Sequence, residues 1–85
     1  MRYSVVIPVF EEEDSIVAVI AELRAARLDP SPLEVIVIDD GSRDRTAARV
    51  EALCAADPRL VLVGHPRRCG KSAAILSGVR AAEGD

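Results

Sequence analysis

Residues 34–46 read EVIVIDDGSRDRT, and this stretch decides the fold class. Val35–Ile38 are four consecutive β-branched residues, a pattern typical of a strand that is buried on both faces of a parallel sheet. The strand runs directly into Asp39 and Asp40, and then into Gly41–Ser42. These residue types are common in turns, and an acid is favourable near the start of a helix. A ligand at the end of the strand would explain the two carboxylates equally well, so both interpretations stay open here.

Strand-like and helix-like segments alternate along the rest of the chain. Strands are predicted from runs of Val, Ile and Leu over Tyr3–Val9, Leu33–Ile38 and Leu60–Val63. Helices are predicted over about Asp14–Leu28, from Asp44 as the N-cap to about Ala56, and over Lys71–Ala82. The third helix contains Gly78, which costs it about 1 kcal/mol relative to Ala.

The first two predicted helices each have one apolar face. In the first helix this face is formed by Ile16, Val19, Ile20 and Leu23, and in the second by Ala47, Val50, Leu53 and Cys54. The order β-α-β-α-β-α predicts a parallel sheet with right-handed crossovers. We therefore expect one α/β domain over residues 1–85, with three α-β-α layers, as in the first half of a doubly wound nucleotide-binding fold.

Composition argues against several classes of function. The net charge is −3, and the two aromatic residues, Tyr3 and Phe10, form no base-stacking platform with basic residues, so no nucleic-acid partner is expected. Cys54 and Cys69 lack a C-x-x-C spacing and no signal peptide is recognisable, so we expect neither a disulfide framework nor a zinc site, in a reducing, cytoplasmic setting. No apolar run approaches the roughly 20 residues that a membrane span needs.

Two segments would lie at the carboxyl ends of the predicted strands, where parallel sheets bind ligands. They are Pro8–Glu12 and the Asp39–Asp40 pair. A carboxylate there could accept a hydrogen bond from a base or a ribose hydroxyl, and Gly41 would allow a ligand to approach the backbone. A plain turn and helix cap explains the same residues equally well.

The loop GHPRRCGKS at residues 64–72 invites comparison with a phosphate-binding P-loop, G-x-x-x-x-G-K-S/T. The spacing is wrong, because His65 occupies the position of the first glycine. Arg67, Arg68 and Lys71 nevertheless gather positive charge at a helix N-terminus, where a diphosphate would be stabilised, although solvated loop charges are the simpler alternative. For His65, the single histidine, a surface or packing role is favoured over catalysis.

Three stretches taken together resemble a known family. They are VVIPVFEEEDSI at residues 5–16, VIDDGSRDRT at 37–46 and RRCGKSAAILSGVRAAEGD at 67–85. In this order and spacing they resemble the N-terminal part of a family 2 glycosyltransferase with the GT-A (Rossmann-like) fold, a group that includes dolichol- and polyprenyl-phosphate sugar synthases. The sequence departs from the family pattern at Glu11, where Asn is common, and at Arg68 and Cys69, where Asn-Phe or similar residues are common.

The resemblance implies a set of nucleotide-sugar-binding residues: Pro8, Val9, Phe10, Glu12, Asp39, Asp40, Gly41, Ser42, Arg67 and Lys71. In the family, an Asp of the acidic pair holds the base, and the following Gly-Ser shapes the turn beside it. Lys71 would lie near the diphosphate, with Arg67 as a weaker candidate, whereas Asp44 and Thr46 would mainly start the helix.

The same resemblance implies metal-dependent transfer of a sugar, with inversion, from a UDP- or GDP-linked donor to an acceptor such as a polyprenyl phosphate or a saccharide. The D-x-D strand that binds Mg²⁺ or Mn²⁺ in the family is not among these 85 residues, so metal ligands and catalytic residues are expected beyond Asp85. We expect a truncated domain that is inactive alone, with an unpaired sheet edge that favours self-association. Cytoplasmic location, at the cytoplasmic face of a membrane for the full-length protein, follows from the family's acceptors.

Two alternatives to the transferase remain at this stage. The first is a non-catalytic nucleotide-binding or assembly module that keeps the crevice for regulation. The second is a P-loop-like phosphate binder, which would prefer ATP or GTP through Lys71 and Ser72, and against which the spacing argues.

Overall fold

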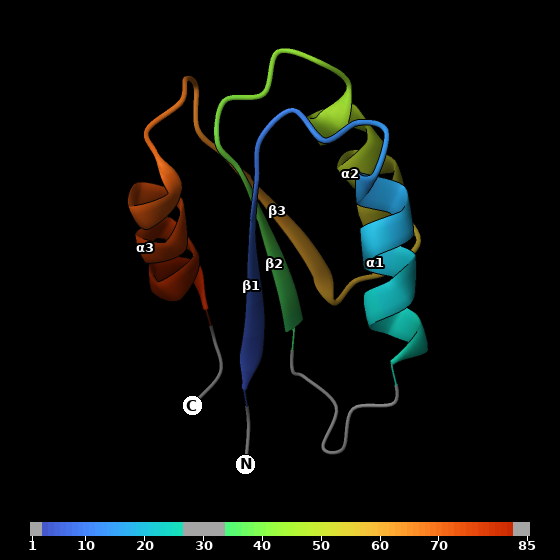
Figure 1. Ribbon diagram of the computed structural model, residues 1–85. Helices are drawn as coiled ribbons and strands as arrows, with labels where there is room; N and C mark the ends of the chain where they lie inside the picture. The colour runs from blue at the N-terminus through green and yellow to red at the C-terminus, as the bar shows by residue number, and fades with distance from the viewer. Residues whose placement is uncertain (1–2, 27–33, 83–85) are drawn as a thin grey trace.

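Three parallel strands form the centre of the molecule, in the order β1-β2-β3 (Figure 1). The computed structural model describes residues 3–26 and 34–82. β1 (Ser4–Val9) pairs with β2 (Glu34–Asp39), which pairs with β3 (Leu60–Gly64). Helices α1 (Ile16–Ala25) and α2 (Thr46–Cys54) cover one face of the sheet, and α3 (Lys71–Ala81) covers the other. The predicted parallel, three-layer α-β-α architecture is thus confirmed.

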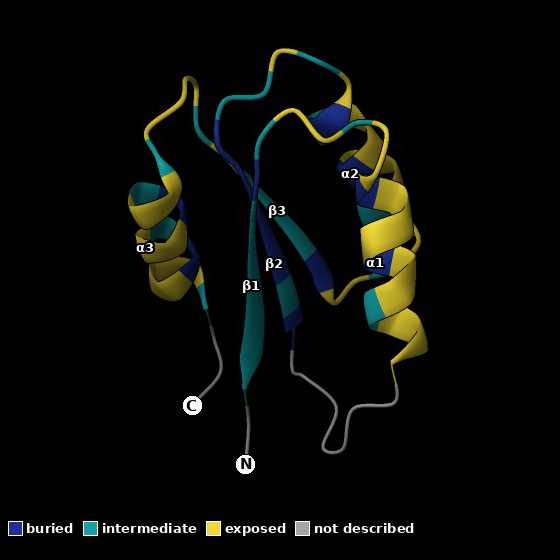
Figure 2. Cartoon of the chain, in the orientation of Figure 1, coloured by how far each residue is buried: buried dark blue, intermediate teal, exposed yellow. Residues whose placement is uncertain are grey.

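The central strand β2 directs its side chains alternately into two cores, as the two-residue period of a strand requires. Val37 packs with the residues beneath α1 and α2, whereas Ile36 and Ile38 pack beneath α3. All three are fully buried, and Figure 2 shows the buried residues along the middle of the sheet. Burial on both faces explains the unbroken run of β-branched residues.

Gly78 lets α3 lie close to the sheet. A Cβ added at this position would lie 2.2 Å from Cγ1 of Val6 on β1. The absence of a side chain therefore leaves room for Val6, which offsets the low helix propensity of glycine. Ala74, one turn earlier on the same helix face, is fully buried against Ile36 and Ile38.

The observed bounds differ from the predicted ones mainly at α1. The helix begins at Ile16 rather than Asp14, because the preceding backbone forms turns in which the amides of Ser15 and Ile16 donate to the Glu12 carbonyl. It ends at Ala25, because Ala26 is extended; residues 27 and 28 of the predicted helix, like Leu33 of the predicted second strand, lie outside the described residues.

The predicted apolar face of α1 is only partly correct. Ile16 and Ile20 are buried, but Val19 retains 39 % of its exposure because it lies on the flank of the buried stripe. In α2 the prediction holds better, since Val50 is fully buried and Leu53 and Cys54 pack against the same core.

Candidate functional site

The register of the sheet brings three loops to one edge. Val9, Asp39 and Gly64 are aligned across the sheet, so the chain leaves all three strands at the same level. The segments that follow are residues 10–15, the acidic loop (residues 39–46) and the basic loop (residues 65–70). In Figure 1 they form the upper end of the molecule. This is the edge at which parallel α/β sheets bind their ligands.

The acidic loop is stabilised by its own side chains. The Asp39 carboxylate accepts the amide of Ser42 at 3.2 Å, which closes the turn directly after β2. Asp44 was predicted as the N-cap of the second helix, but the N-cap position is Arg45, which makes no side-chain capping bond. Asp44 lies one residue earlier and accepts both the amide of Thr46, at 3.0 Å, and its hydroxyl, at 2.6 Å. The hydrogen bond from the Thr46 hydroxyl is the main reason why the pKa of Asp44 lies below its usual value.

The acidic loop also holds the segment after β1. The amide of Glu11 donates to Oγ of Ser42 and that of Glu12 to Oγ1 of Thr46, each at 2.8 Å. Glu11 has a φ of 49°, in the left-handed region that a β-carbon disfavours. Asn adopts this conformation more readily than Glu, which gives a physical reason for the Asn that is common at this position in the resembling family.

The basic loop is held by Asp40. Oδ1 of this carboxylate accepts from Nδ1 of His65 and from the amide of Cys69, and Oδ2 accepts from the amide of Gly70, each at 2.9 Å. Asp40 is only 4 % exposed. Its pKa is lowered chiefly by the hydrogen bond from His65 and by that from the Cys69 amide. Asp39 therefore bonds to the acidic loop and Asp40 to the basic loop. Successive residues of an extended chain point to opposite faces, and Asp40 directly follows β2.

His65 links the basic loop to α3. Nδ1 lies 2.9 Å from Oδ1 of Asp40 and Nε2 lies 2.8 Å from Oγ of Ser77. In the Nδ1–H tautomer the ring donates to the carboxylate and accepts from the serine hydroxyl. The packing role favoured from sequence fits this arrangement. Its specific partners lie 25 residues before it and 12 residues after it, so no local pattern could have identified them.

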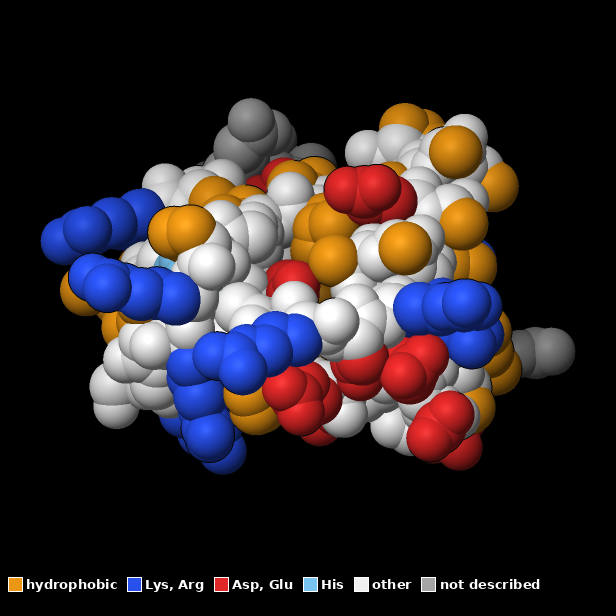
Figure 3. All heavy atoms as spheres, turned by 90° about the horizontal axis from the view of Figure 1, so that it is seen from above, with side chains coloured by type: hydrophobic (Ala, Val, Ile, Leu, Met, Phe, Trp, Pro, Cys, Tyr) orange, Lys and Arg blue, Asp and Glu red, His pale blue; other side chains and the backbone are white. Residues whose placement is uncertain are grey.

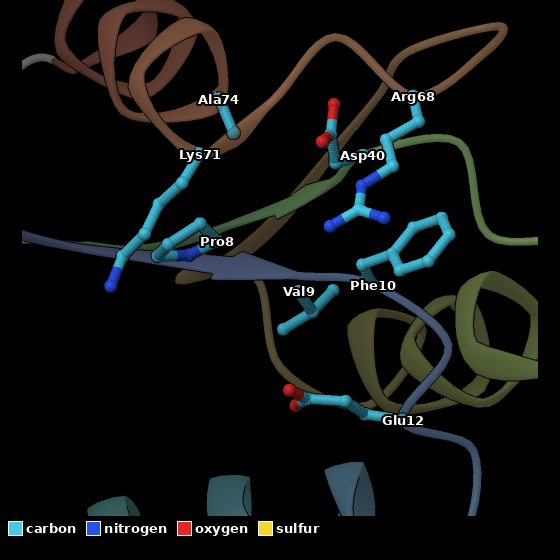
Figure 4. A pocket seen from close by; sticks show the side chains of 8 residues that line it. All are labelled: Pro8, Val9, Phe10, Glu12, Asp40, Arg68, Lys71 and Ala74. Atoms are coloured by element: carbon cyan, nitrogen blue, oxygen red, sulfur yellow. The ribbon is translucent and has the colours of Figure 1, made fainter.

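A pocket of about 240 Å³ opens between β1, the basic loop and α3 (Figure 4). Its lining consists of Pro8, Val9, Phe10, Glu12, Asp40, Arg68, Lys71 and Ala74. A second hollow of about 350 Å³ shares Phe10 and Arg68 with it and is further lined by Glu11, Gly41, Ser42, Arg43, Pro66 and Arg67. The guanidinium of Arg68 lies 4.3 Å from the centre of the Phe10 ring, at the boundary of the two spaces.

Charge is unevenly distributed around these hollows. Figure 3 looks down on this edge and shows Lys and Arg side chains mainly on the side of α3, with Asp and Glu side chains mainly on the side of α1 and α2. In Figure 4, Lys71 extends from α3 and Arg68 from the basic loop toward Phe10, and Glu12 lies on the far side of β1 from both. The site can therefore present cations to an anionic group while a carboxylate faces the opposite part of a ligand.

The structure brings most of the residues predicted from sequence to these two spaces. Six line the pocket, namely Pro8, Val9, Phe10, Glu12, Asp40 and Lys71. Three more line the neighbouring hollow, namely Gly41, Ser42 and Arg67, and Phe10 lines both spaces. Asp39 lines neither and instead closes the turn through Ser42.

From the sequence, Gly41 was expected to let a ligand approach the backbone. In the structure it lets the basic loop approach instead. Its φ is 77°, and an added Cβ would lie 2.3 Å from the carbonyl carbon of Arg67 and 2.4 Å from the amide nitrogen of Arg68. The missing side chain thus makes room for the backbone of the basic loop, with which the acidic loop is in direct contact.

Two pocket residues, Arg68 and Ala74, were not among the ten predicted site residues, although Arg68 was noted as one of three cations where a diphosphate would be stabilised. Ala74 lies one helical turn after Lys71, so the helix period could have placed it on the same face. Arg68 could have been noticed only as part of a basic run, because its position over Phe10 is a long-range contact.

Within the described ranges, Asp40, His65 and Cys69 form the one group of His, Cys, Asp and Glu side chains that is close enough to hold a metal ion. Their ligand atoms all lie within 4.8 Å of one another. No helix in the described part of the chain combines the length and apolar character that crossing a membrane requires.

Comparison with known proteins identifies the family. The family model described as glycosyl transferase family 2 matches residues 4–85. The chain belongs to this family. The family 2 assignment confirms the resemblance inferred from the three sequence stretches, and the GT-A type of fold follows from it and from the structural likeness below.

The relatives of this family 2 chain include enzymes named for polyprenyl-phosphate acceptors. It is 37% identical over 86 residues to a bactoprenol glucosyl transferase of Shigella phage SfV, covering 100% of this chain and 28% of that protein. It is 40% identical over 84 residues to an undecaprenyl-phosphate 4-deoxy-4-formamido-L-arabinose transferase of Pectobacterium atrosepticum, covering 96% of this chain and 26% of the relative. The chain thus spans little more than a quarter of the length of these relatives.

A solved mannosyltransferase structure is similar in fold to this chain. The mannosyltransferase PcManGT from Pyrobaculum calidifontis, in complex with GDP-Man and Mn²⁺, matches with a TM-score of 0.84 and 28% sequence identity. The match covers 98% of this chain and 25% of that one.

Proposed function

We propose that this chain is the nucleotide-recognition half of a glycosyltransferase that transfers a sugar from a UDP- or GDP-linked donor to an acceptor, for which a polyprenyl phosphate is the leading candidate. The observation that carries the proposal is the pocket at the carboxyl edge of the sheet, where cations of α3 and the basic loop face a carboxylate of the segment after β1. Membership of glycosyl transferase family 2 and the GDP-Man-bound neighbour support it. The names of the two relatives above support the acceptor class.

The donor would span both spaces. The pocket alone, at about 240 Å³, is smaller than typical ligand sites of about 300–1,000 Å³, but it is continuous in its lining with the second hollow through Phe10 and Arg68. The diphosphate would lie against Lys71 and the N-terminus of α3, where both side-chain charge and helix dipole favour an anion. Phe10 would stack on the base.

Of the two acids, only Asp40 would contact the donor directly. Asp40 lines the pocket, and its carboxylate has about four acceptor positions, of which three are taken by His65, Cys69 and Gly70. One acceptor position is thus left for a base N–H or a ribose hydroxyl. Asp39 would act indirectly, by holding the turn that carries Gly41 and Ser42.

A divalent ion, Mg²⁺ or Mn²⁺, would stabilise the departing diphosphate in the complete enzyme. The neighbour's complex with Mn²⁺ supports this requirement. The 85-residue sequence contains no D-x-D, so we place the ligands of that ion, the general base and the acceptor pocket outside these residues, and we propose an inverting transfer for which this chain alone is insufficient.

Donor binding can be measured directly by calorimetry. We expect the full 85-residue chain, with Mn²⁺ present, to bind UDP or GDP in preference to ATP, and Lys71→Gln to weaken this binding about tenfold or more because a charge-assisted contact is lost. Arg80→Gln is the matched control, since Arg80 is an exposed cation in the last turn of the same helix. Equal effects of both substitutions, or a folded chain that binds none of the nucleotides, would contradict the proposal.

A non-catalytic nucleotide-binding or assembly module is the second candidate. It predicts the same calorimetric result, so the two differ in whether a strand with a D-x-D sequence completes the domain. Preference for ATP would instead support the P-loop-like alternative.

Self-association through β1 is a further part of the proposal. Among the described residues, β1 is an edge strand that pairs only with β2. An unpaired edge offers backbone donors and acceptors to a second chain. We expect sedimentation velocity to show concentration-dependent association, and a concentration-independent monomer would overturn this expectation. We also propose that the full-length protein acts at the cytoplasmic face of a membrane, because a polyprenyl-phosphate acceptor would lie in that membrane.

A further inference from the structure

We propose that Asp40, His65 and Cys69 form a binding site for a borderline divalent cation such as Zn²⁺. Their carboxylate oxygen, imidazole nitrogen and thiol sulfur converge from the end of β2 and from both ends of the basic loop, within 4.8 Å of one another. His65 and Cys69 line neither hollow, whereas Asp40 also lines the pocket. The proposal is argued from the convergence of the three ligand atoms and does not rest on the glycosyltransferase proposal. It also differs from the Mg²⁺ or Mn²⁺ requirement in the kind of ligand atoms.

The ligands are already held close to a coordinating arrangement. Oδ1 of Asp40 and Nδ1 of His65 are 2.9 Å apart, and the amide of Cys69 donates to the same Oδ1 at 2.9 Å, which fixes the backbone of the cysteine beside the carboxylate. Ligand atoms of a tetrahedral zinc site lie roughly 3.3–3.8 Å apart, given bonds of about 2.0–2.3 Å. Since the three ligand atoms lie at most 4.8 Å apart, movements of about 1 Å or less would bring them to the spacing of a tetrahedral site.

A second residue supports His65 as a ligand. Metal-binding histidines usually donate their other ring N–H to a nearby acceptor. Nε2 of His65 lies 2.8 Å from Oγ of Ser77, so the ring can switch to the tautomer in which Nε2–H donates to the serine and Nδ1 is free for the metal. The metal would then take the place of the Nδ1 proton between His65 and Asp40.

The charge and the protons balance. Binding moves the ring proton of His65 from Nδ1 to Nε2 and releases one proton, that of the Cys69 thiol, to the buffer, while the hydrogen bond from Sγ to the Arg67 carbonyl is lost. The carboxylate and the thiolate together neutralise a divalent cation. Nitrogen and sulfur ligands favour Zn²⁺ or Co²⁺ over Mg²⁺, which prefers oxygen. Three protein ligands leave a fourth position for water, as in catalytic zinc sites.

The test uses the full chain without a purification tag, in a phosphine reductant. Calorimetry should show one Zn²⁺ bound per chain, with no competition from millimolar Mg²⁺, and Co²⁺ should produce a thiolate charge-transfer band in the near ultraviolet. Cys69→Ser should abolish this band and weaken Zn²⁺ binding by on the order of 100-fold or more, and Ser77→Ala by about tenfold, within the range for residues that support a ligand.

Cys54→Ser is the matched control, because Cys54 is the other free thiol and lies on α2. It should leave both the affinity and the cobalt band unchanged. As a second measurement that needs no variant, Zn²⁺ should slow alkylation of Cys69 and leave alkylation of Cys54 unaffected. Zn²⁺ binding that survives Cys69→Ser, a cobalt spectrum without the thiolate band, or equal protection of both cysteines would overturn the proposal.

Discussion

The acidic loop and the basic loop leave neighbouring strands at the same edge of the sheet, yet they are stabilised in opposite ways. The acidic loop is closed by contacts over two or three residues, from Asp39 to Ser42 and from Asp44 to Thr46. The basic loop depends on Asp40, which lies 25 to 30 residues earlier in the chain. The acidic loop is therefore stabilised by its own residues, whereas the basic loop is stabilised by Asp40, which follows β2.

This difference between the two loops reflects the separate roles of Asp39 and Asp40. Asp39 completes a local turn of a kind common for Asp, while Asp40 positions the basic loop through the Cys69 and Gly70 amides and His65. A loop that is held from a distance can be released by a single substitution elsewhere. The acidic loop, in contrast, should fail only when its own residues are changed.

The largest effect is expected where the two loops touch. Gly41→Ala would place a Cβ 2.3 Å from the Arg67 backbone at a φ of 77°, so clash and backbone strain together should cost about 3 kcal/mol or more of unfolding free energy. Urea denaturation measures this loss. Gly64→Ala is the control, because nothing lies within 4 Å of its added Cβ, and it should change stability by about 0.5 kcal/mol or less. Similar losses for both glycines would show that the contact between the loops is unimportant.

A smaller loss is expected from the acidic loop itself. Thr46 is fully buried, and Thr46→Val keeps its shape but removes the acceptor for the Glu12 amide and the donor to Asp44. The cost should be about 1–3 kcal/mol, measured by denaturant unfolding. Thr46→Ser keeps the hydroxyl and loses only a methyl group, so it should cost about 1 kcal/mol or less. A serine variant that is less stable than the valine variant would contradict this account.

Acid should release the basic loop. The pKa of Asp40 in the folded chain lies below its ordinary value of 3.8, so the unfolded chain binds more protons in this range and stability falls as pH decreases. The contribution should be complete above about pH 5 and be lost as pH falls below about 4. Hydrogen-exchange protection of the Cys69 and Gly70 amides, compared at pH 6 and pH 3, reports on the release.

Asp40→Asn should have low protection of these two amides already at pH 6. Asp44→Asn is the matched variant in the acidic loop, and it should leave them protected at pH 6. Loss of protection in both variants would mean that the basic loop is not held by Asp40 specifically.

The smallest effect is a gain. Glu11 has a φ of 49°, and Asn tolerates this conformation better, so Glu11→Asn should raise the unfolding free energy by about 0.5 kcal/mol. Glu11→Gln removes the charge without this conformational advantage and should leave stability unchanged. If the two variants were equally stabilising, charge rather than backbone conformation would be the cause.

The sequence alone was sufficient for the fold. Unbroken β-branched runs such as Val35–Ile38 require burial on both faces, and their alternation with apolar helix faces requires a parallel, three-layer arrangement. These are consequences of short-range periodicity, which a sequence displays directly. The expectation that Pro8, Glu12 and Lys71 share one pocket came from the family resemblance, and all three line the pocket in the structure.

Only the tertiary structure decided how those residues are connected. The place of Arg68 over Phe10 and the convergence of His65 and Cys69 on Asp40 depend on contacts across 25 to 58 residues. Such contacts depend on the strand register and on the closeness of two loops at Gly41, and no local pattern encodes either. The residue types of the site follow from sequence, and its hydrogen bonds follow from packing.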